Sequence, residues 1–182
     1  MISREDKSIR LNMVDMHQFF IDKIDDAMAH ERYIEASWLI YSCMENRFFR
    51  VLEKFKNQCK YCTGKCKERS NRLSISTKIK CVKRLLENNV ECISESFTSK
   101  QLEDISSWLA DRNKKMHNLL SLETYKNVDT EFKKSATKGR AILDDLYESC
   151  TKFRSKFFDP EYIFIFPEAA MEKCPCNKKR GN

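Results

Sequence analysis

Glycine and proline are scarce in this sequence, with three of each among 182 residues. Both residues interrupt helices, glycine through its backbone freedom and proline through its missing N–H, so few breaks in regular structure are expected. Leucine, lysine, glutamate, isoleucine, methionine and alanine are frequent instead, and these residues favour helices. The composition therefore predicts an all-α protein that folds as a single domain over residues 1–182.

Long apolar runs are also missing, since no stretch approaches the roughly 20 residues needed to cross a bilayer. The N-terminus is charged and has no apolar signal region behind it. Cysteine occurs nine times, an odd number. Four cysteines stand alone in helical patterns, where a free thiol behaves as a small buried hydrophobe: Cys43, Cys81, Cys92 and Cys150. A reducing compartment suits such a chain, so we expect a cytoplasmic protein without membrane contacts.

Apolar residues at helical spacing predict a bundle of about five helices. The expected helices cover about residues 9–30, 33–55, 76–88, 98–122 and 129–158. Thr98 and Gln101 have the spacing of a capping box, in which Thr98 accepts from the backbone of Gln101 and Gln101 reaches back. Gly139 is expected to be a weak point of the last helix. After Pro160 the apolar alternation over residues 162–167 predicts an extended C-terminal tail.

Basic residues concentrate between Lys54 and Arg84, where eleven lysines and arginines accompany a single acid, Glu68. This segment carries a net +10, although the whole chain carries only +7. Such a field favours a polyanion, above all RNA, through phosphate contacts and counterion release. A solvated face that only maintains solubility is the alternative. The residues expected to bind RNA are Lys60, Lys65, Lys67, Arg69, Arg72, Lys114 and Lys115.

Three cysteines with x2 and x3 spacing lie inside the basic segment, and Gly64 between them permits a tight turn. They resemble a zinc knuckle that lacks its fourth ligand, which the Cys-Pro-Cys motif near the C-terminus would supply. The expected ligands are Cys59, Cys62 and Cys66, with either Cys174 or Cys176 as the fourth. A structural zinc ion would then tie the tail at residues 171–182 to the Cys-rich loop at residues 57–71. Unliganded thiols or a redox disulfide are the alternatives, and His17 and His30 are expected at the surface.

An arginine occupies an apolar position of the expected fourth helix. Arg112 falls where the stripe of Leu102, Ile105 and Leu109 requires its next member. A guanidinium in a protein does not lose its charge, so Arg112 has to meet a buried partner or open onto a cleft. Asn113 and His117 are four residues apart and therefore neighbours on one flank of the helix, toward which a long arginine can curl.

This arginine, amide and imidazole suit RNA cleavage by attack of the ribose 2′-hydroxyl on the adjacent phosphate. His117 would act as general base or acid, Arg112 would hold the phosphate and offset transition-state charge, and Asn113 would orient either group. The reaction needs no metal ion. On spacing alone, however, the pattern favours the alternative of an ion-paired Arg112 beside a capped or core histidine.

The ten residues from Asp111 to Leu120, DRNKKMHNLL, resemble the Arg-x4–6-His signature of HEPN domains, including the polar residue that follows the arginine. The resemblance covers the helical part of the chain, about residues 9–158. It places the motif late in a helical bundle, as here. The stretch from Tyr41 to Leu52, with Glu45 and Asn46, also resembles the family's central helix, from which a polar residue faces the site.

The resemblance implies a metal-independent endoribonuclease with a role as a toxin or in phage defence, restrained by an antitoxin or another regulatory partner. It also implies a homodimer, in which the motif helices of two subunits meet and two Arg/His sets form one cleft. Members of the family that are silenced by nucleotidylation carry a tyrosine two places after the histidine. Leu119 stands there in this sequence, so control by a nucleotidyltransferase is not expected.

Two other functions stay open. A non-catalytic RNA-binding or regulatory module would use the basic segment and the zinc loop to hold RNA, with Arg112 as an anchor of the bundle. A zinc-stapled interaction protein would bind metal without nucleic acid. Salt-sensitive RNA binding without product distinguishes the first of these from the nuclease.

Overall fold

The computed structural model describes residues 4–55, 73–119 and 125–157; for residues 4–15 and 125–126 it describes the backbone alone. Within these residues all regular structure is helical, in agreement with the predicted all-α class. The helices are α1 (Arg4–Ala29), α2 (Tyr33–Glu53), α4 (Ile75–Glu87), α5 (Glu91–Ser94), α6 (Ser99–His117) and α7 (Tyr125–Phe157). The Cys-rich loop and the extended tail that the sequence predicts lie outside the described residues.

The five predicted helices are present, with ends that differ by up to about five residues. The N-terminal helix begins earlier, at Arg4, and the motif helix ends earlier, at His117. The short α5 was not predicted, because four residues are too few to show a helical period. Its Cys92 and Ile93 are nevertheless fully buried. Among the described helices, none combines the length and the apolar character that crossing a membrane requires.

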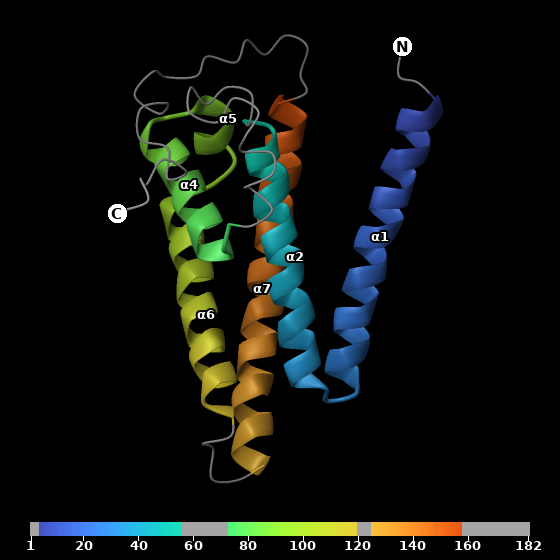
Figure 1. Ribbon diagram of the computed structural model, residues 1–182, viewed down its shortest axis with the longest axis vertical. Helices are drawn as coiled ribbons and strands as arrows, with labels where there is room; N and C mark the ends of the chain where they lie inside the picture. The colour runs from blue at the N-terminus through green and yellow to red at the C-terminus, as the bar shows by residue number, and fades with distance from the viewer. Residues whose placement is uncertain (1–3, 56–72, 120–124, 158–182) are drawn as a thin grey trace, which may run out of the picture.

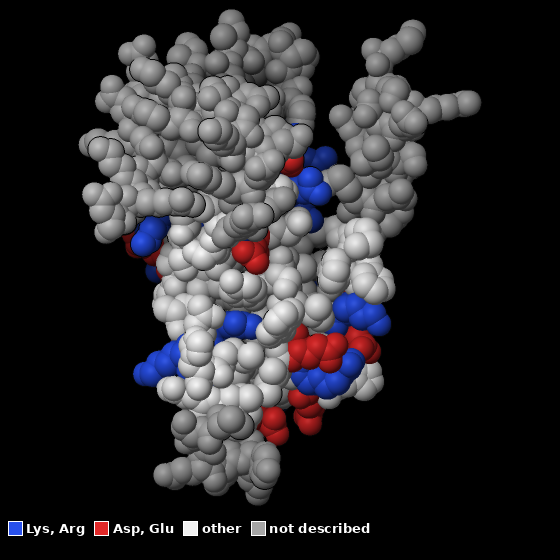
Figure 2. Space-filling model, in the orientation of Figure 1, with Lys and Arg blue, Asp and Glu red and all other residues white. Residues whose placement is uncertain are grey.

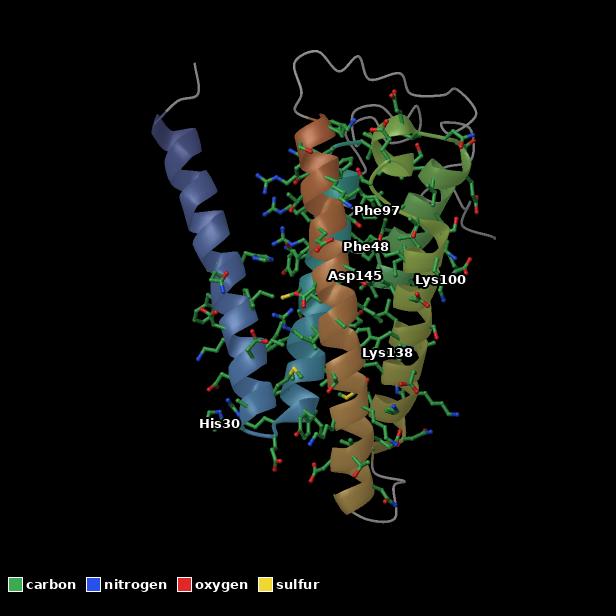
Figure 3. The ribbon with its side chains drawn as sticks, turned by 180° about the vertical axis from the view of Figure 1, so that it is seen from behind. His30, Phe48, Phe97, Lys100, Lys138 and Asp145 are labelled. Atoms are coloured by element: carbon green, nitrogen blue, oxygen red, sulfur yellow. The ribbon has the colours of Figure 1, made fainter. Side chains whose placement is uncertain are left out.

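The centre of the bundle is α2, as its apolar circumference predicts. Figure 1 shows α7 beside it, α1 on one side, and α4 and α6 on the other. Phe48 of α2 is fully buried and faces the same interior as Phe97 (Figure 3). The large side chains that fill the core are Phe48, Phe97, Trp108, Phe132 and Phe153. Because α2 lies between α1 and α6 (Figure 1), residues on one side of α2 face α1 and residues on another side face α6.

The contact between α6 and α7 depends on the absence of a side chain at Gly139. A Cβ at this position would lie 2.6 Å from both Cε2 and Cζ2 of Trp108. The indole cannot easily retreat, because it is buried and its Nε1 donates to the carbonyl oxygen of Ser135 over 2.8 Å. The helix α7 passes through Gly139 without a break. The prediction of a weak point is therefore wrong: glycine is there for close packing.

The start of α6 confirms half of the predicted capping box. Thr98 Oγ1 accepts from the backbone N–H of Gln101 over 3.1 Å. The Gln101 side chain does not reach back, however. Its Nε2 donates to the carbonyl oxygen of Asp145 and to Ser149 Oγ, each over 2.9 Å. Gln101 thus joins α6 to α7, because a tertiary partner competes successfully with the local one.

Candidate functional site

Arg112 lies on the buried side of α6, with only 7% of its surface exposed, as its place in the apolar stripe predicts. Its Cζ lies 4.8 Å from the centre of the Tyr41 ring on α2, which is a cation–π contact. Its Nη1 donates to Oδ1 of the neighbouring Asn113 over 3.1 Å. A tyrosine ring and an amide oxygen therefore hold this guanidinium.

No carboxylate of the described residues pairs with the positive charge of Arg112. Among the described residues, no acid forms an ion pair with its guanidinium, and its buried Nε has no hydrogen-bond partner. Burial lowers the pKa of Arg112, and the neighbouring Tyr41 opposes that effect, but a guanidinium stays charged near neutral pH. Within the described part of the chain, the alternative of an ion-paired Arg112 therefore finds no acid partner. A buried cation without a counter-charge is an energetically costly arrangement that an incoming anion would relieve.

His117 is the last residue of α6 and is exposed. His117 stands five positions after Arg112 in the helix, so the two side chains leave the helix about 140° apart in direction. Asn113 shares a flank with His117, as predicted, and is half-buried. The hydrogen bonds of the described residues join Arg112 to Asn113 and join neither of them to His117. A single chain therefore brings Arg112 and Asn113 into contact, whereas His117 stays apart from both.

A second polar pair joins α2 to α4, close to the contact of Tyr41 with Arg112. Lys78, only 3% exposed, donates from Nζ to Oε1 of Glu45 over 2.9 Å. Burial and the nearby Glu45 carboxylate raise the pKa of Tyr41, whereas Arg112 lowers it. Tyr41 therefore stands between a carboxylate and a guanidinium on one face of α2. Sequence analysis did not single out Tyr41 or Lys78, although the four-residue spacing of Tyr41 and Glu45 would place them on one face.

The Glu45–Lys78 pair supports an asymmetric prediction. Glu45→Ala should lower the free energy of unfolding by about 2 kcal/mol, because it leaves a buried ammonium without its partner. This loss is smaller than that for a fully buried pair, because the Glu45 side chain is 34% exposed and the pair is partly screened by water. Lys78→Met should cost less than about 1 kcal/mol, because methionine fills the space and the remaining carboxylate reaches water. Chemical denaturation of both variants measures the difference. Equal losses of stability in the two variants would contradict this explanation, in which the unpaired buried lysine causes the larger loss.

The two RNA-binding candidates within the described residues differ. Lys114 is exposed. Lys115 is largely buried, and its Nζ lies 2.8 Å from Oδ2 of Asp111 and 3.2 Å from Oε2 of Glu131. Burial alone would lower the pKa of Lys115, but these two carboxylates outweigh it and raise the pKa. Lys115 therefore fastens α6 to α7, and Lys114 is the one that is free to meet a phosphate.

The remaining candidates lie outside the described residues. These are Lys60, Lys65, Lys67, Arg69 and Arg72 for RNA, and Cys59, Cys62, Cys66, Cys174 and Cys176 for zinc. Within the described part of the chain, no group of histidine, cysteine and acid side chains is arranged to hold a metal ion. The four cysteines predicted to be buried thiols are buried and form no disulfide: Cys43, Cys81, Cys92 and Cys150.

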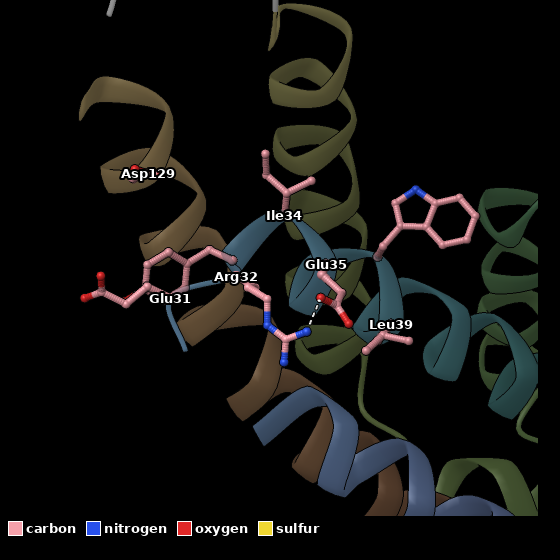
Figure 4. A pocket seen from close by; sticks show the side chains of 8 residues that line it. Glu31, Arg32, Ile34, Glu35, Leu39 and Asp129 are labelled. Carbon is pink, nitrogen blue, oxygen red and sulfur yellow. Dashed lines mark hydrogen bonds and ion pairs between the residues drawn. The ribbon is translucent and has the colours of Figure 1, made fainter. Parts of the chain in front are cut away.

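A hollow beside the turn from α1 to α2 does not belong to this site. It is lined by residues 31–35, Trp38 and Leu39, with Asp129 of α7 opposite (Figure 4). Its arginine is already neutralised, since Arg32 pairs with Glu35 over 2.9 Å and also with Asp26. In Figure 2 the surface over the lower halves of α2 and α6 has uncharged side chains between separate charged groups, and Trp38 is 58% exposed.

Comparison of the chain with models of protein families, with curated proteins and with solved structures finds no match.

Proposed function

We propose that this chain is a metal-independent endoribonuclease of the HEPN type, with Arg112, Asn113 and His117 in its reaction centre. The observation that carries the proposal is the buried guanidinium of Arg112, which has no carboxylate partner among the described residues. A structural arginine in a helical bundle is usually neutralised by an acid. A phosphate would supply the missing negative charge through short, charge-assisted hydrogen bonds.

In this proposal each of the three residues has its own role. A substrate phosphate would replace the Asn113 oxygen on Nη1 of Arg112, because an anion binds a guanidinium more strongly than a neutral amide does. The displaced Asn113 amide would turn toward His117, four residues on. The exposed imidazole would take the proton of the 2′-hydroxyl as it attacks phosphorus, and the 5′-oxygen would leave with a proton from a second acid. The products are a 2′,3′-cyclic phosphate and a free 5′-hydroxyl.

A homodimer supplies that second acid in the proposed mechanism. Arg112 and His117 leave α6 in different directions, so a single chain does not close the site around one phosphate. Pairing of two copies through the surface over the lower halves of α2 and α6 would bring two Arg/His sets to one RNA. The exposed Trp38 would lie within or near such an interface. A toxin or phage-defence role belongs to the same proposal.

Incubation of the purified protein with mixed RNA and a chelator tests the proposed activity. The wild-type protein should cut RNA without added metal and leave cyclic phosphate ends, and His117→Ala should leave uncut RNA while it retains the helical circular dichroism spectrum. His30→Ala is the matched control, because His30 is also exposed. Equal cleavage by the wild-type protein and His117→Ala would rule the mechanism out. RNA binding without product would identify the non-catalytic module instead.

Structural zinc at three loop cysteines and one tail cysteine remains a prediction of the sequence. Metal analysis of the purified protein should find about one zinc ion per chain, and Cys62→Ser should remove it, because a tetrahedral thiolate site does not tolerate the loss of a sulfur. Cys150→Ser is the control, since Cys150 is a buried thiol in α7 that forms no disulfide. Zinc-free protein with unchanged stability would contradict the prediction. Neither result bears on the chemistry at His117.

A further inference from the structure

A second arginine stacks on a tyrosine on another side of α2, facing α1 and α7. Arg47 has its Cζ 4.7 Å from the centre of the Tyr147 ring. His17 of α1 contacts the same ring, with the two ring centres 3.8 Å apart and the planes at 89°. The sequence predicts both His17 and His30 at the surface. Only His30 is exposed, since tertiary packing half-buries His17.

This cluster holds two buried nitrogen atoms without partners among the described residues. Nε2 of His17 and Nε of Arg47 are each shielded from solvent, and no described residue forms a hydrogen bond with either atom. Among the described residues, no carboxylate forms an ion pair with Arg47. Buried polar atoms of this kind are rare and require an explanation, since each costs the free energy of its desolvation. Two of them, on different helices and around one tyrosine, indicate a common acceptor.

The charge around the cluster is positive. Burial raises the pKa of the Cys150 thiol, and the charges of Arg47 and Arg154 oppose that effect, so both guanidinium groups act on this position. Arg140, at the other end of the cluster, is neutralised by Asp25, whose Oδ1 lies 2.8 Å from its Nε, and by Asp144. Nitrogen-bearing side chains in this region point from the bundle toward α1 (Figure 3). Arg47 and Arg154 are thus left with positive charge that described acids do not cancel.

We propose that His17, Arg47 and Tyr147 form a binding site for a phosphate group, carried either by a mononucleotide or by the backbone of an RNA. Arg47 would contribute its charge and its N–H groups, and His17 a neutral N–H. The Tyr147 hydroxyl is hydrogen-bonded to Arg47 and Cys43, and burial raises its pKa, so it stays neutral and holds the guanidinium in place. A charged guanidinium and a neutral imidazole N–H from two helices match the acceptor oxygens of one phosphate.

The pKa of His17 provides a way to detect phosphate binding at this site. Burial, and then the charge of Arg47, lower the pKa of His17 from 6.5 to about 4. A bound phosphate beside the imidazole reverses the sign of the local field and should raise that pKa by about 1–3 pH units. His17 is one of only three histidines in the chain. Its C2 proton is therefore an observable signal in proton NMR, alongside those of His30 and His117.

The site is separate from the proposed reaction centre and does not depend on it. Arg47 faces α1 and α7, whereas Tyr41 faces Arg112 on α6. A protein without any nuclease activity would still bind phosphate at His17. The signals of His17 and His117 report the two sites independently.

NMR titration of the full chain with AMP, with a ten-nucleotide single-stranded RNA and with inorganic phosphate tests the proposal, with sodium chloride matching the ionic strength. We expect a saturable shift of the His17 signal with at least one phosphate-bearing ligand, none with chloride alone, and an unmoved His30 signal. Saturation with AMP and phosphate identifies a free nucleotide as the source of the group. Saturation with RNA alone identifies a backbone phosphate.

Two variants make the titration decisive. Arg47→Gln should weaken the His17 response about 10–100-fold, as expected for loss of a charged hydrogen bond, and leave the His117 signal as in the wild-type protein. Arg47→Lys, which keeps the charge and the fold, should give an intermediate affinity because it loses the planar stack on Tyr147. A His17 signal that no phosphate-bearing ligand moves would overturn the proposal. So would an equal response in the wild-type protein and in the folded Arg47 variants.

Discussion

Arg112→Met should reduce RNA cleavage by about 10²–10³-fold or more, while the thermal stability of the protein stays equal or rises. The activity falls because methionine offers neither charge nor donors to the phosphate, and one lost donor at developing negative charge costs about this much. The stability holds because methionine fills the buried volume and removes an uncompensated charge, and replacing buried charge by apolar volume is commonly neutral or stabilising. Single-turnover cleavage and thermal denaturation measure the two effects.

This double outcome separates a catalytic arginine from an anchor of the bundle. An anchor would lose stability on Arg112→Met, because the contact with Tyr41 and the hydrogen bond to Asn113 both disappear. Arg112→Lys keeps a charge but not the planar fork, so an intermediate loss of activity is expected. Lys114→Met is the matched control on the exposed side of the same helix. It should weaken RNA binding and its salt dependence slightly and leave the cleavage rate of bound RNA unchanged.

Retained cleavage in folded Arg112→Met would remove Arg112 from the reaction centre. Loss of cleavage together with a destabilisation of several kcal/mol would support the anchor instead. Tyr41→Phe sharpens the distinction, since it keeps the ring under the guanidinium and removes the hydroxyl near Glu45. We expect it to cut RNA at close to the wild-type rate.

Gly139→Ala should lower the free energy of unfolding by about 2 kcal/mol, although alanine is the better helix former by about 1 kcal/mol. The new methyl group would lie 2.6–2.7 Å from Cε2, Cζ2 and Nε1 of Trp108, which is overpacking against a rigid ring. Moving the indole would also break its hydrogen bond to Ser135. For a chain of this length, the expected fall in melting temperature is about 4–8 °C.

A double-mutant cycle with Trp108→Phe assigns the loss to this contact. Phenylalanine lacks the part of the indole that the methyl group meets, so Gly139→Ala should cost much less in that background. Lys138→Ala is the control, because it lies beside Gly139 on the exposed side of α7 and should change stability by less than about 0.5 kcal/mol. Equal losses with and without the indole would show that the clash is not the cause.

The candidate site was predictable only in part. The position of Arg112 on the buried face follows from the period of α6, because Leu102, Ile105 and Leu109 define that face within one helix. Its partner does not follow, because Tyr41 lies about seventy residues earlier on another helix. The different directions of Arg112 and His117 follow from the 3.6-residue period of the helix, because two side chains five positions apart do not share a face.

Local chemistry in the sequence by itself determined the all-α class, the approximate bounds of the long helices, the Thr98 cap and the inward direction of Arg112. These features depend on hydrogen bonds and apolar periods within one helix. The tertiary structure alone decided that Gln101 bridges to α7, that Gly139 admits Trp108, that Tyr41 lies beneath Arg112 and that His17 joins Arg47. Each of these depends on the rotation and crossing of two helices, which the packing of the whole core sets and no single helix encodes.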